Sequence, residues 1–343
     1  MKDYAVVYFN GIERGFSIPS TLCEFELGGM EFSIKLYGLL IAIGYLLALM
    51  VATKLATKKG LDVDALYDAI IFGTVGGIVG ARAYYVAFNW DYYSANPSHI
   101  MNISEGGLAI YGGIIGALLV GFIVCKIRKF SVLDTFDLAA VGFLIGQGVG
   151  RWGNFTNQEA FGTNTELPWG MISDKTTGYI IDNQDFFAEK GYAMDPYTAV
   201  HPTFLYESIW CIIGAVILYF MFDKFRRFRG QVILSYGIWY GLGRVIIEGF
   251  RTDSLYIGDT TIRVSQMLSG VLVVVCAIIL VAGFVKAKNA PKAIPVPIEP
   301  IEMEEDMATE TLEEPVEESN EEESENIEDI SQEKGESENE QKE

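Results

Sequence analysis

The sequence has little of what a soluble active site usually uses for chemistry. It contains only two histidines, His99 and His201, and four cysteines, none of them in CxxC spacing. Cys125, Cys211 and Cys276 lie in apolar runs and are typical of small buried hydrophobes, so neither a disulfide framework nor a metal site is expected. The chain also has no P-loop, GxGxxG, HExxH or GxSxG motif. Nucleotide, zinc and serine-hydrolase mechanisms are therefore unsupported.

The net negative charge is confined almost entirely to one end of the chain. Residues 299–343 hold 21 Asp and Glu against two Lys, a net charge of −19 out of −20 for the whole chain. The preceding 298 residues are therefore close to neutral, and half of all residues are hydrophobic. We expect residues 1–290 to form a membrane domain. The acidic segment 291–343 is expected to be a disordered tail, because it cannot bury enough apolar surface to fold.

Long apolar runs dominate the first part. A membrane-spanning helix needs about 20 mainly apolar residues. Seven segments meet this description, at about 33–53, 66–88, 108–125, 134–152, 204–222, 231–250 and 266–285. The sequence thus predicts an all-α polytopic membrane protein with seven transmembrane helices.

The basic residues alternate along the chain and predict its orientation. The turns at 54–60, 126–129 and 223–229 are rich in Lys and Arg, as is the stretch after the seventh run. The intervening loop 89–107 has no Lys or Arg, and the segment 153–203 has only two. Because cytoplasmic loops carry an excess of positive charge, we expect an outside N-terminus and a cytoplasmic C-terminus. The long segment 153–203 would then form a small external head.

The most polar stretch inside the membrane domain is Gly150–Gly162, at the outer end of the fourth run. It contains Arg151, Asn154, Asn157 and Glu159. An ionisable group at membrane depth costs about 3 kcal/mol or more and is a functional candidate by default. A guanidinium group also matches a phosphate in shape and stays charged. The alternative for Arg151 is a side chain that merely extends from a helix end to the interface.

Three further polar positions lie in or beside other runs. Arg244 and Glu248 are four residues apart, so they share a helix face with Tyr240 one turn earlier. They form either an internal ion pair or a second cation of the same site. His201 precedes Pro202 at the start of the fifth run, and it is either structural or a proton acceptor.

Glycines surround the remaining candidates. Gly106, Gly107, Gly112 and Gly113 flank Tyr111 and suit a backbone that approaches a ligand. Tyr111 and Tyr37 could equally be anchors at the membrane surface, and Arg82 could pair structurally. Glycines 142, 146 and 150 stand four apart, which favours close helix packing or leaves room for a lipid.

Several of these motifs, in the same order, resemble one family. The stretches Gly150–Gly162, Gly80–Arg82, Glu105–Gly113, His201–Glu207 and Tyr240–Glu248 are similar to those of bacterial prolipoprotein diacylglyceryl transferases. The resemblance implies a multi-pass enzyme of the bacterial inner membrane with its active site at the outer leaflet. Such enzymes move the diacylglyceryl group of phosphatidylglycerol to the lipobox cysteine of a preprolipoprotein signal peptide, form a thioether and release glycerol phosphate. No cofactor, metal or nucleic acid is expected.

The resemblance and the residue chemistry together predict roles. Arg151 and Arg244 would hold the phosphate, while Glu159 and Glu248 would orient the two arginines. Tyr111 and His201 are the candidates for deprotonating the thiol; many family members carry a histidine where Tyr111 stands. The residues expected to contact phosphatidylglycerol are Arg151, Asn154, Asn157, Glu159, Gly162, Tyr37, Arg82, Gly106, Gly107, Gly112, Gly113 and Tyr240. The alternatives are a transporter and a lipid-binding scaffold without catalysis.

Overall fold

The computed structural model describes residues 4–27, 30–102, 106–252, 254, 256, 260 and 263–289. The chain divides into two units, residues 1–291 and 292–343, and every described residue belongs to the first. The predicted acidic tail 291–343 and Glu105 lie outside the described residues.

Seven long helices form the first unit: α1 (Leu36–Lys58), α2 (Val63–Phe88), α4 (Ile110–Ile127), α5 (Val132–Asn157), α8 (Thr203–Phe220), α9 (Gln231–Ile247) and α10 (Val264–Asn289). Each overlaps one predicted run. Among the described helices, six are long and apolar enough to cross a membrane, with α8 continued to residue 225 by the π-helical turn η2 (Met221–Phe225). The chain is therefore consistent with a polytopic membrane protein. The remaining helix, α9, has 17 residues, and the exact count of seven spans stays a prediction.

Side-chain caps fix two of the helix starts. The carboxylate of Asp62 accepts a hydrogen bond from the Ala65 amide at the start of α2, and the Ser131 hydroxyl accepts one from Asp134 at the start of α5. Such caps satisfy amides that have no partner within the helix. The first helix begins at Leu36, three residues later than predicted, because the residues before it form a strand.

The expectation of an all-α chain is wrong, because five strands are present. Strands β1 (Tyr4–Phe9), β2 (Ile12–Pro19) and β5 (Met171–Ser173) form an antiparallel sheet in the order β2-β1-β5. Strands β3 (Thr21–Leu27) and β4 (Met30–Lys35) pair as a hairpin. The turn between β1 and β2 is Asn10-Gly11, with Gly11 at φ +81°, a conformation that glycine adopts without steric cost.

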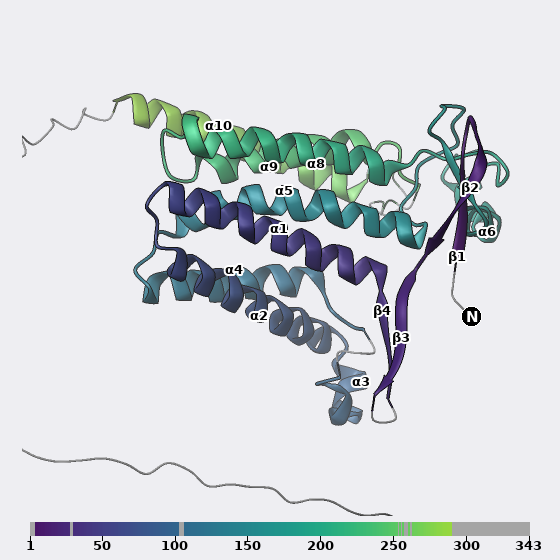
Figure 1. Ribbon diagram of the computed structural model, residues 1–343, viewed down its shortest axis with the longest axis horizontal. Helices are drawn as coiled ribbons and strands as arrows, with labels where there is room; N and C mark the ends of the chain where they lie inside the picture. Colours follow the sequence, from purple (N-terminus) through teal and green to yellow (C-terminus); the bar gives the residue numbers. More distant parts are fainter. Residues whose placement is uncertain are drawn as a thin grey trace, which may run out of the picture. The chain divides into compact units, whose positions relative to one another are not determined.

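The helices pack mainly in pairs, with α5 at the centre. The largest contacts join α2 to α4, α1 to α5, α9 to α10 and α5 to α8 (Figure 1). Glycines allow the closest approach: an added Cβ at Gly76 would lie 2.9 Å from the carbonyl oxygen of Gly116, and one at Gly80 would lie 2.9 Å from its Cα. Close helix packing explains these glycines.

A second, smaller core lies outside the bundle. It joins β1 to the segment that follows α5, which includes β5, α6 (Asp174–Asp182) and α7 (Gln184–Glu189). Its buried members are Val7, Phe161, Met171, Ile180, Phe187, Val200 and Phe204. The first five residues of the segment 153–203 are helical, because α5 continues to Asn157, and an external head stays a prediction.

The two ends of the bundle differ in charge. The turns α1–α2, α4–α5 and α8–α9 lie at one end, which we call the basic end, and the strands lie at the other, the strand end (Figure 1). At the basic end Lys58 Nζ lies 2.6 Å from Asp223 Oδ2, and Arg128 Nε lies 2.8 Å from Asp68 Oδ2. The grouping of the basic turns at one end agrees with the predicted alternation.

Candidate active site

The polar stretch singled out in the sequence is largely helical. Residues 150–157 complete α5, so only residues 158–162 of this stretch are not helical. At the helix end Gln158 has φ +59° and Ala160 has φ +56°, the left-handed region that non-glycine residues rarely adopt. Such backbone strain is typical of functional sites. The polar side chains thus project from a rigid helix end and from a tightly constrained turn.

Glu207 is the centre of the site. Its side chain, on α8, is only 5 % exposed, and Arg151 Nε on α5 lies 2.5 Å from its Oε2. Arg244 Nη1 on α9 lies 3.1 Å from its Oε1, and Arg251 Nη1 lies 3.3 Å from the same oxygen. One buried carboxylate therefore gathers three guanidinium groups from separate parts of the chain.

A second carboxylate completes the group, which we call the arginine cluster (Arg151, Arg244, Arg251, Glu207 and Glu248). Arg244 Nη2 lies 2.7 Å from Glu248 Oε2, so the predicted pairing across one helical turn is confirmed. The Ser254 hydroxyl donates to Glu248 Oε1 at 2.9 Å. Of the ionisable side chains described here, three cations face two anions. Glu207 and Arg251 were not predicted as site residues from the sequence, although Glu207 closes the motif that His201 opens.

Glu159 has a different partner from the one predicted. It accepts hydrogen bonds from Asn154 Nδ2 at 2.9 Å and from Asn157 Nδ2 at 3.4 Å. Arg151 Nη1 in turn donates to Asn154 Oδ1 at 3.4 Å. Glu159 therefore orients the two asparagines, and Glu207 takes the role predicted for Glu159 toward Arg151.

Three other predicted residues lie on or against segments that carry residues of the cluster. The ring of Tyr37 on α1 packs on Gly153, where an added Cβ would overlap it. Tyr240 stacks on Tyr236 with ring centroids 5.6 Å apart, one turn before Arg244. Gly162 leaves no room for a side chain, because a Cβ would lie 2.8 Å from both His201 Cβ and the Phe250 carbonyl oxygen. Close backbone packing explains this glycine.

His201 lies beside the cluster. The Gly162 amide donates to its carbonyl at 2.9 Å, and Gly162 forms a backbone bridge with Arg251. The imidazole Nδ1 lies 3.0 Å from the Tyr206 hydroxyl, which accepts a hydrogen bond from Trp169 Nε1 at 2.9 Å. Partial burial lowers the pKa of His201 from its ordinary value. The neutral imidazole, the form that accepts a proton, is therefore favoured.

Tyr111 occupies a different setting. Its side chain is 63 % exposed on α4, a helix that packs mainly on α2. Of the contacts recorded among the described residues, none joins Tyr111 to the arginine cluster. Gly112, beside it, is buried against Gly80 and Tyr84 of α2. An added Cβ at Gly113 would lie 3.5 Å from the carbonyl oxygen of Gly77, also on α2. Helix packing explains these two glycines, and their predicted contact with lipid stays untested.

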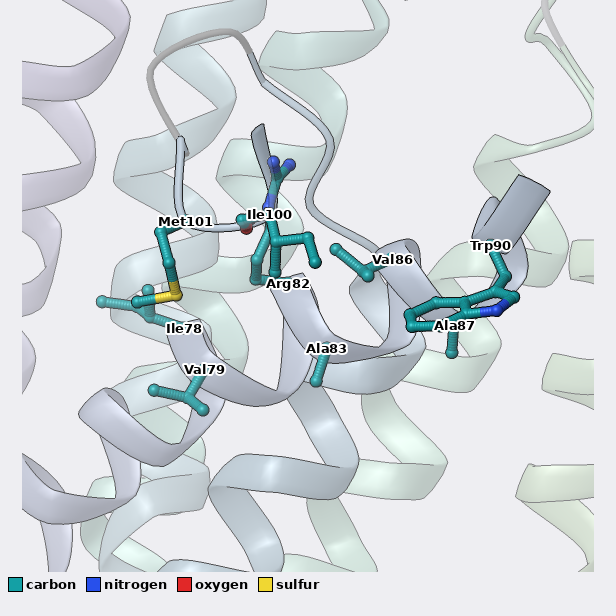
Figure 2. Close-up of a pocket in the computed structure, with 9 residues that line it drawn as sticks. All are labelled: Ile78, Val79, Arg82, Ala83, Val86, Ala87, Trp90, Ile100 and Met101. Carbon is teal, nitrogen blue, oxygen red and sulfur yellow. The ribbon is translucent and has the colours of Figure 1, made fainter. Parts of the chain in front are cut away.

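Arg82 is also separate from the cluster. Its five N–H groups donate to the backbone carbonyls of His99, Ile100, Asn102, Gly106 and Gly107 at 2.7 to 3.0 Å. Gly106 and Gly107 have φ of +86° and +76°, which this loop requires. The guanidinium group points away from the apolar side chains that line a cavity of about 560 Å³ on α2 (Figure 2). In this conformation Arg82 has no donor left for a phosphate.

An apolar cavity of about 420 Å³ lies between α1, α2, α4 and α5. Gly146 and Gln147 line it on α5, one turn before Gly150 and Arg151. An added Cβ at Gly146 or Gly150 would meet nothing within 4 Å. A Cβ at Gly142, however, would lie 3.3 Å from Ala48 Cβ, and one at Gly44 would lie 3.2 Å from Gly146 Cα. The 142–150 face thus combines close packing on α1 with open space at Gly146 and Gly150, and its contact with a lipid stays a prediction.

Comparison with known proteins decides the family. The family model described as prolipoprotein diacylglyceryl transferase matches residues 24–282. The chain belongs to this family. The diacylglyceryl transferase match covers all seven long helices except the last residues of α10, and it excludes the acidic tail.

Several curated proteins named phosphatidylglycerol–prolipoprotein diacylglyceryl transferase are similar over most of their length. The protein from Lysinibacillus sphaericus is 43 % identical over 272 residues, covering 78 % of this chain and 94 % of its own. Those from Clostridium novyi and Finegoldia magna are 41 % and 40 % identical over 268 and 256 residues. These cover 78 % and 75 % of this chain, and 98 % and 92 % of the relatives. The family resemblance expected from the motifs is thereby confirmed.

Proposed function

We propose that this transferase moves the diacylglyceryl group of phosphatidylglycerol to the thiol of a lipobox cysteine in a preprolipoprotein. The names of the relatives, which specify phosphatidylglycerol and prolipoprotein, support the two substrates. The structural observation that carries the proposal is the convergence of Arg151 and Arg244 on the single carboxylate of Glu207. Two guanidinium groups that bridge one small anion are spaced to bridge a phosphate as well.

We place the basic end in the cytoplasm and the strand end outside, in a bacterial inner membrane. The basic turns support this orientation. With 17 residues α9 is at the lower limit for a membrane span, so we count seven spans. The small core around β1 and β5 then forms the external head, and the arginine cluster lies at the level of the outer leaflet.

In this mechanism the substrate supplies the nucleophile. The cysteine sulfur attacks the carbon of the diacylglyceryl unit that carries the phosphate. A C–S bond forms, and the C–O bond between that carbon and the phosphate breaks. Glycerol phosphate leaves with the bonding electron pair. Arg151 and Arg244, with Arg251 behind Glu207, stabilise the negative charge that develops on the leaving group. Glu207 and Glu248 hold the arginines in position, and Glu159 holds Asn154 and Asn157.

The thiol proton must go to a base. His201 fits this role better than Tyr111, because burial favours its neutral form and because its carbonyl accepts a hydrogen bond from Gly162, which forms a backbone bridge with Arg251. A phenol with an ordinary pKa near 10 is a poor base at neutral pH. The cavity beside Gly146 is the place for acyl chains, since it is apolar and opens one turn below Arg151.

The test is a release assay. The full chain is purified in detergent and mixed with phosphatidylglycerol and a lipobox peptide, and glycerol phosphate and the thioether product are measured. Arg151→Ala and Arg244→Ala should each remove most of the activity. Arg128→Ala is the matched control, because this arginine forms an exposed pair with Asp68 at the basic end.

Two results would overturn the proposal. Near-normal turnover in both cluster variants would exclude the phosphate-binding role of the arginines. Binding of phosphatidylglycerol by the wild-type chain without any release would favour a scaffold, and lipid movement across a vesicle membrane without release would favour a transporter.

A further inference from the structure

Two tryptophans join α8 to α9 by reciprocal contacts. Trp210 on α8 and Trp239 on α9 stack with ring centroids 4.5 Å apart and an interplanar angle of 21°. Each indole N–H donates to the backbone carbonyl of the other residue, at 2.9 Å from Trp210 and 3.0 Å from Trp239. We call these two residues the tryptophan pair.

Each indole also lies on a glycine of the opposite helix. A Cβ at Gly214 on α8 would overlap Trp239 Nε1, and a Cβ at Gly243 on α9 would overlap Trp210 Nε1. Each indole N–H is thus bonded to the main chain of the other helix, and each ring packs on a glycine of that helix. These contacts restrict both sliding and rotation of one helix against the other. Apolar packing alone would do this less specifically in a membrane, because lipid is as apolar as leucine.

The tryptophan pair lies next to the arginine cluster. Glu207 precedes Trp210 by three residues, which is nearly one helical turn, and Arg244 directly follows Gly243. A slide of α9 by one residue would move Arg244 about 1.5 Å along the axis. The 3.1 Å contact between Arg244 Nη1 and Glu207 Oε1 would lose its present geometry, and the two side chains could meet only in other rotamers.

We propose that Trp210 and Trp239 are positioning residues, which fix the register of α8 and α9 so that Arg244 meets Glu207. Their effect on catalysis rests on the proposed function, whereas their effect on the Glu207–Arg244 contact does not. Neither indole needs to touch the substrate for this role.

Gly243→Ala tests the proposal, with Gly237→Ala as its matched control. Both glycines are buried on α9, but a Cβ at Gly237 would lie 2.6 Å from Cys276 Sγ on α10, away from α8. Gly243→Ala should lower kcat at least about tenfold, since a displacement near 1 Å can cost a hundredfold. Gly237→Ala should stay within about twofold at a similar loss of thermal stability. Equal losses of activity in the two variants would mean a purely structural role and overturn the proposal.

A second measurement does not depend on activity. The coupling between Glu207→Gln and Arg244→Gln is measured by thermal unfolding in a double-mutant cycle. It should vanish in the Gly243→Ala background and persist in the Gly237→Ala background. Loss of coupling with no activity in any sample would refute the proposed function but keep the positioning role.

Conservative variants cover the case in which Gly243→Ala fails to fold. Trp210→Phe and Trp239→Phe keep an aromatic ring and remove the N–H donor. Each should lower kcat severalfold and weaken the Glu207–Arg244 coupling, with KM for phosphatidylglycerol nearly unchanged. Full activity and full coupling in both would overturn the proposal.

Discussion

Each end of α5 contributes to a cluster of arginine–carboxylate ion pairs, but the carboxylates of the two clusters have different additional partners. At the basic end Asp134 and Asp137 on α5 pair with two arginines of the α8–α9 turn: Arg226 contacts both aspartates, and Arg229 Nε lies 3.1 Å from Asp134 Oδ2. We call this group the aspartate cluster. At the strand end Arg151 enters the arginine cluster around Glu207.

The partners of the carboxylates distinguish the two clusters. Asp137 also accepts hydrogen bonds from the amides of Gly230, Val232 and Ile233 at 2.8 to 2.9 Å, which caps the start of α9. In the aspartate cluster two cations meet two anions, and backbone amides occupy the remaining oxygens. In the arginine cluster the cations described outnumber the anions, three to two. Exposure does not separate the clusters, since Arg226 is 16 % and Arg229 68 % exposed, against 21 % for Arg151 and 17 % for Arg244. A cluster with balanced charges stabilises the fold, while one with more cations than anions is able to bind an anionic ligand.

The largest difference between the two ends is expected when one arginine of each cluster is replaced by alanine. Arg244→Ala should lower kcat/KM by roughly 10²–10³-fold, about 3 to 4 kcal/mol, because a donor to the developing charge is lost. Arg226→Ala should leave kcat/KM per folded molecule nearly unchanged and lower the thermal stability instead. Steady-state release of glycerol phosphate and thermal unfolding in detergent measure both quantities. A large loss of kcat/KM in Arg226→Ala would show that the two ends do not differ as described.

The thiol step gives the next largest effect. His201→Gln should lower kcat by about 10²-fold, a usual contribution of a general base, and Tyr111→Phe should have little effect. Burial lowers the pKa of His201, so the imidazole is neutral at and above its ordinary pKa of about 6.5. Activity should therefore fall only when the pH drops below that value and the imidazole becomes protonated. His201→Gln should remove this acidic limb of the pH profile, whereas a phenolate base would place the limb near pH 10.

Much of this arrangement follows from local sequence, and the rest depends on distant contacts. The apolar runs predict the long helices, and four-residue spacing predicts the pairing of Arg244 with Glu248. Glu207 lies 37 residues from Arg244 and 44 from Arg251 along the chain. Periodicity cannot place such groups together, so the centre of the site was missed.

The strands were missed for a different reason. The Asn10-Gly11 turn between apolar alternating segments was a readable hairpin signal. The alternating pattern is short, and the N-terminal segment is rich in polar groups, so it was not assigned a structure. Strand β5 has only three residues, and its pairing with β1 depends on the core formed by Val7 and Met171. No local pattern predicts this pairing.

Asp137→Asn tests the basic end in the comparison and should change stability more than activity. Asparagine keeps the size and one oxygen for the α9 amides but leaves Arg226 without its charge partner. Breaking a buried ion pair costs about 3 kcal/mol or more. Thermal unfolding should show this loss, with kcat of the folded fraction close to normal. Asp68→Asn in the exposed pair with Arg128 is the control and should cost under about 1 kcal/mol.

Arg82→Lys should have the smallest effect on kcat/KM. It tests whether an arginine that is bonded to backbone carbonyls differs in role from the arginines that are bonded to carboxylates. Lysine offers three donors in place of five, so some carbonyls of the 99–107 loop lose their partner. Amide hydrogen exchange in residues 99–102 should become faster, while kcat/KM changes by about threefold or less, as expected from weak hydrogen bonds in membrane proteins. A tenfold rise in KM for phosphatidylglycerol with unchanged hydrogen exchange would instead support the direct lipid contact predicted from the sequence. Arg82 would then bind lipid, as proposed for Arg151 and Arg244. Whether an arginine is bonded to backbone carbonyls or to carboxylates would not then distinguish lipid-binding arginines from structural ones.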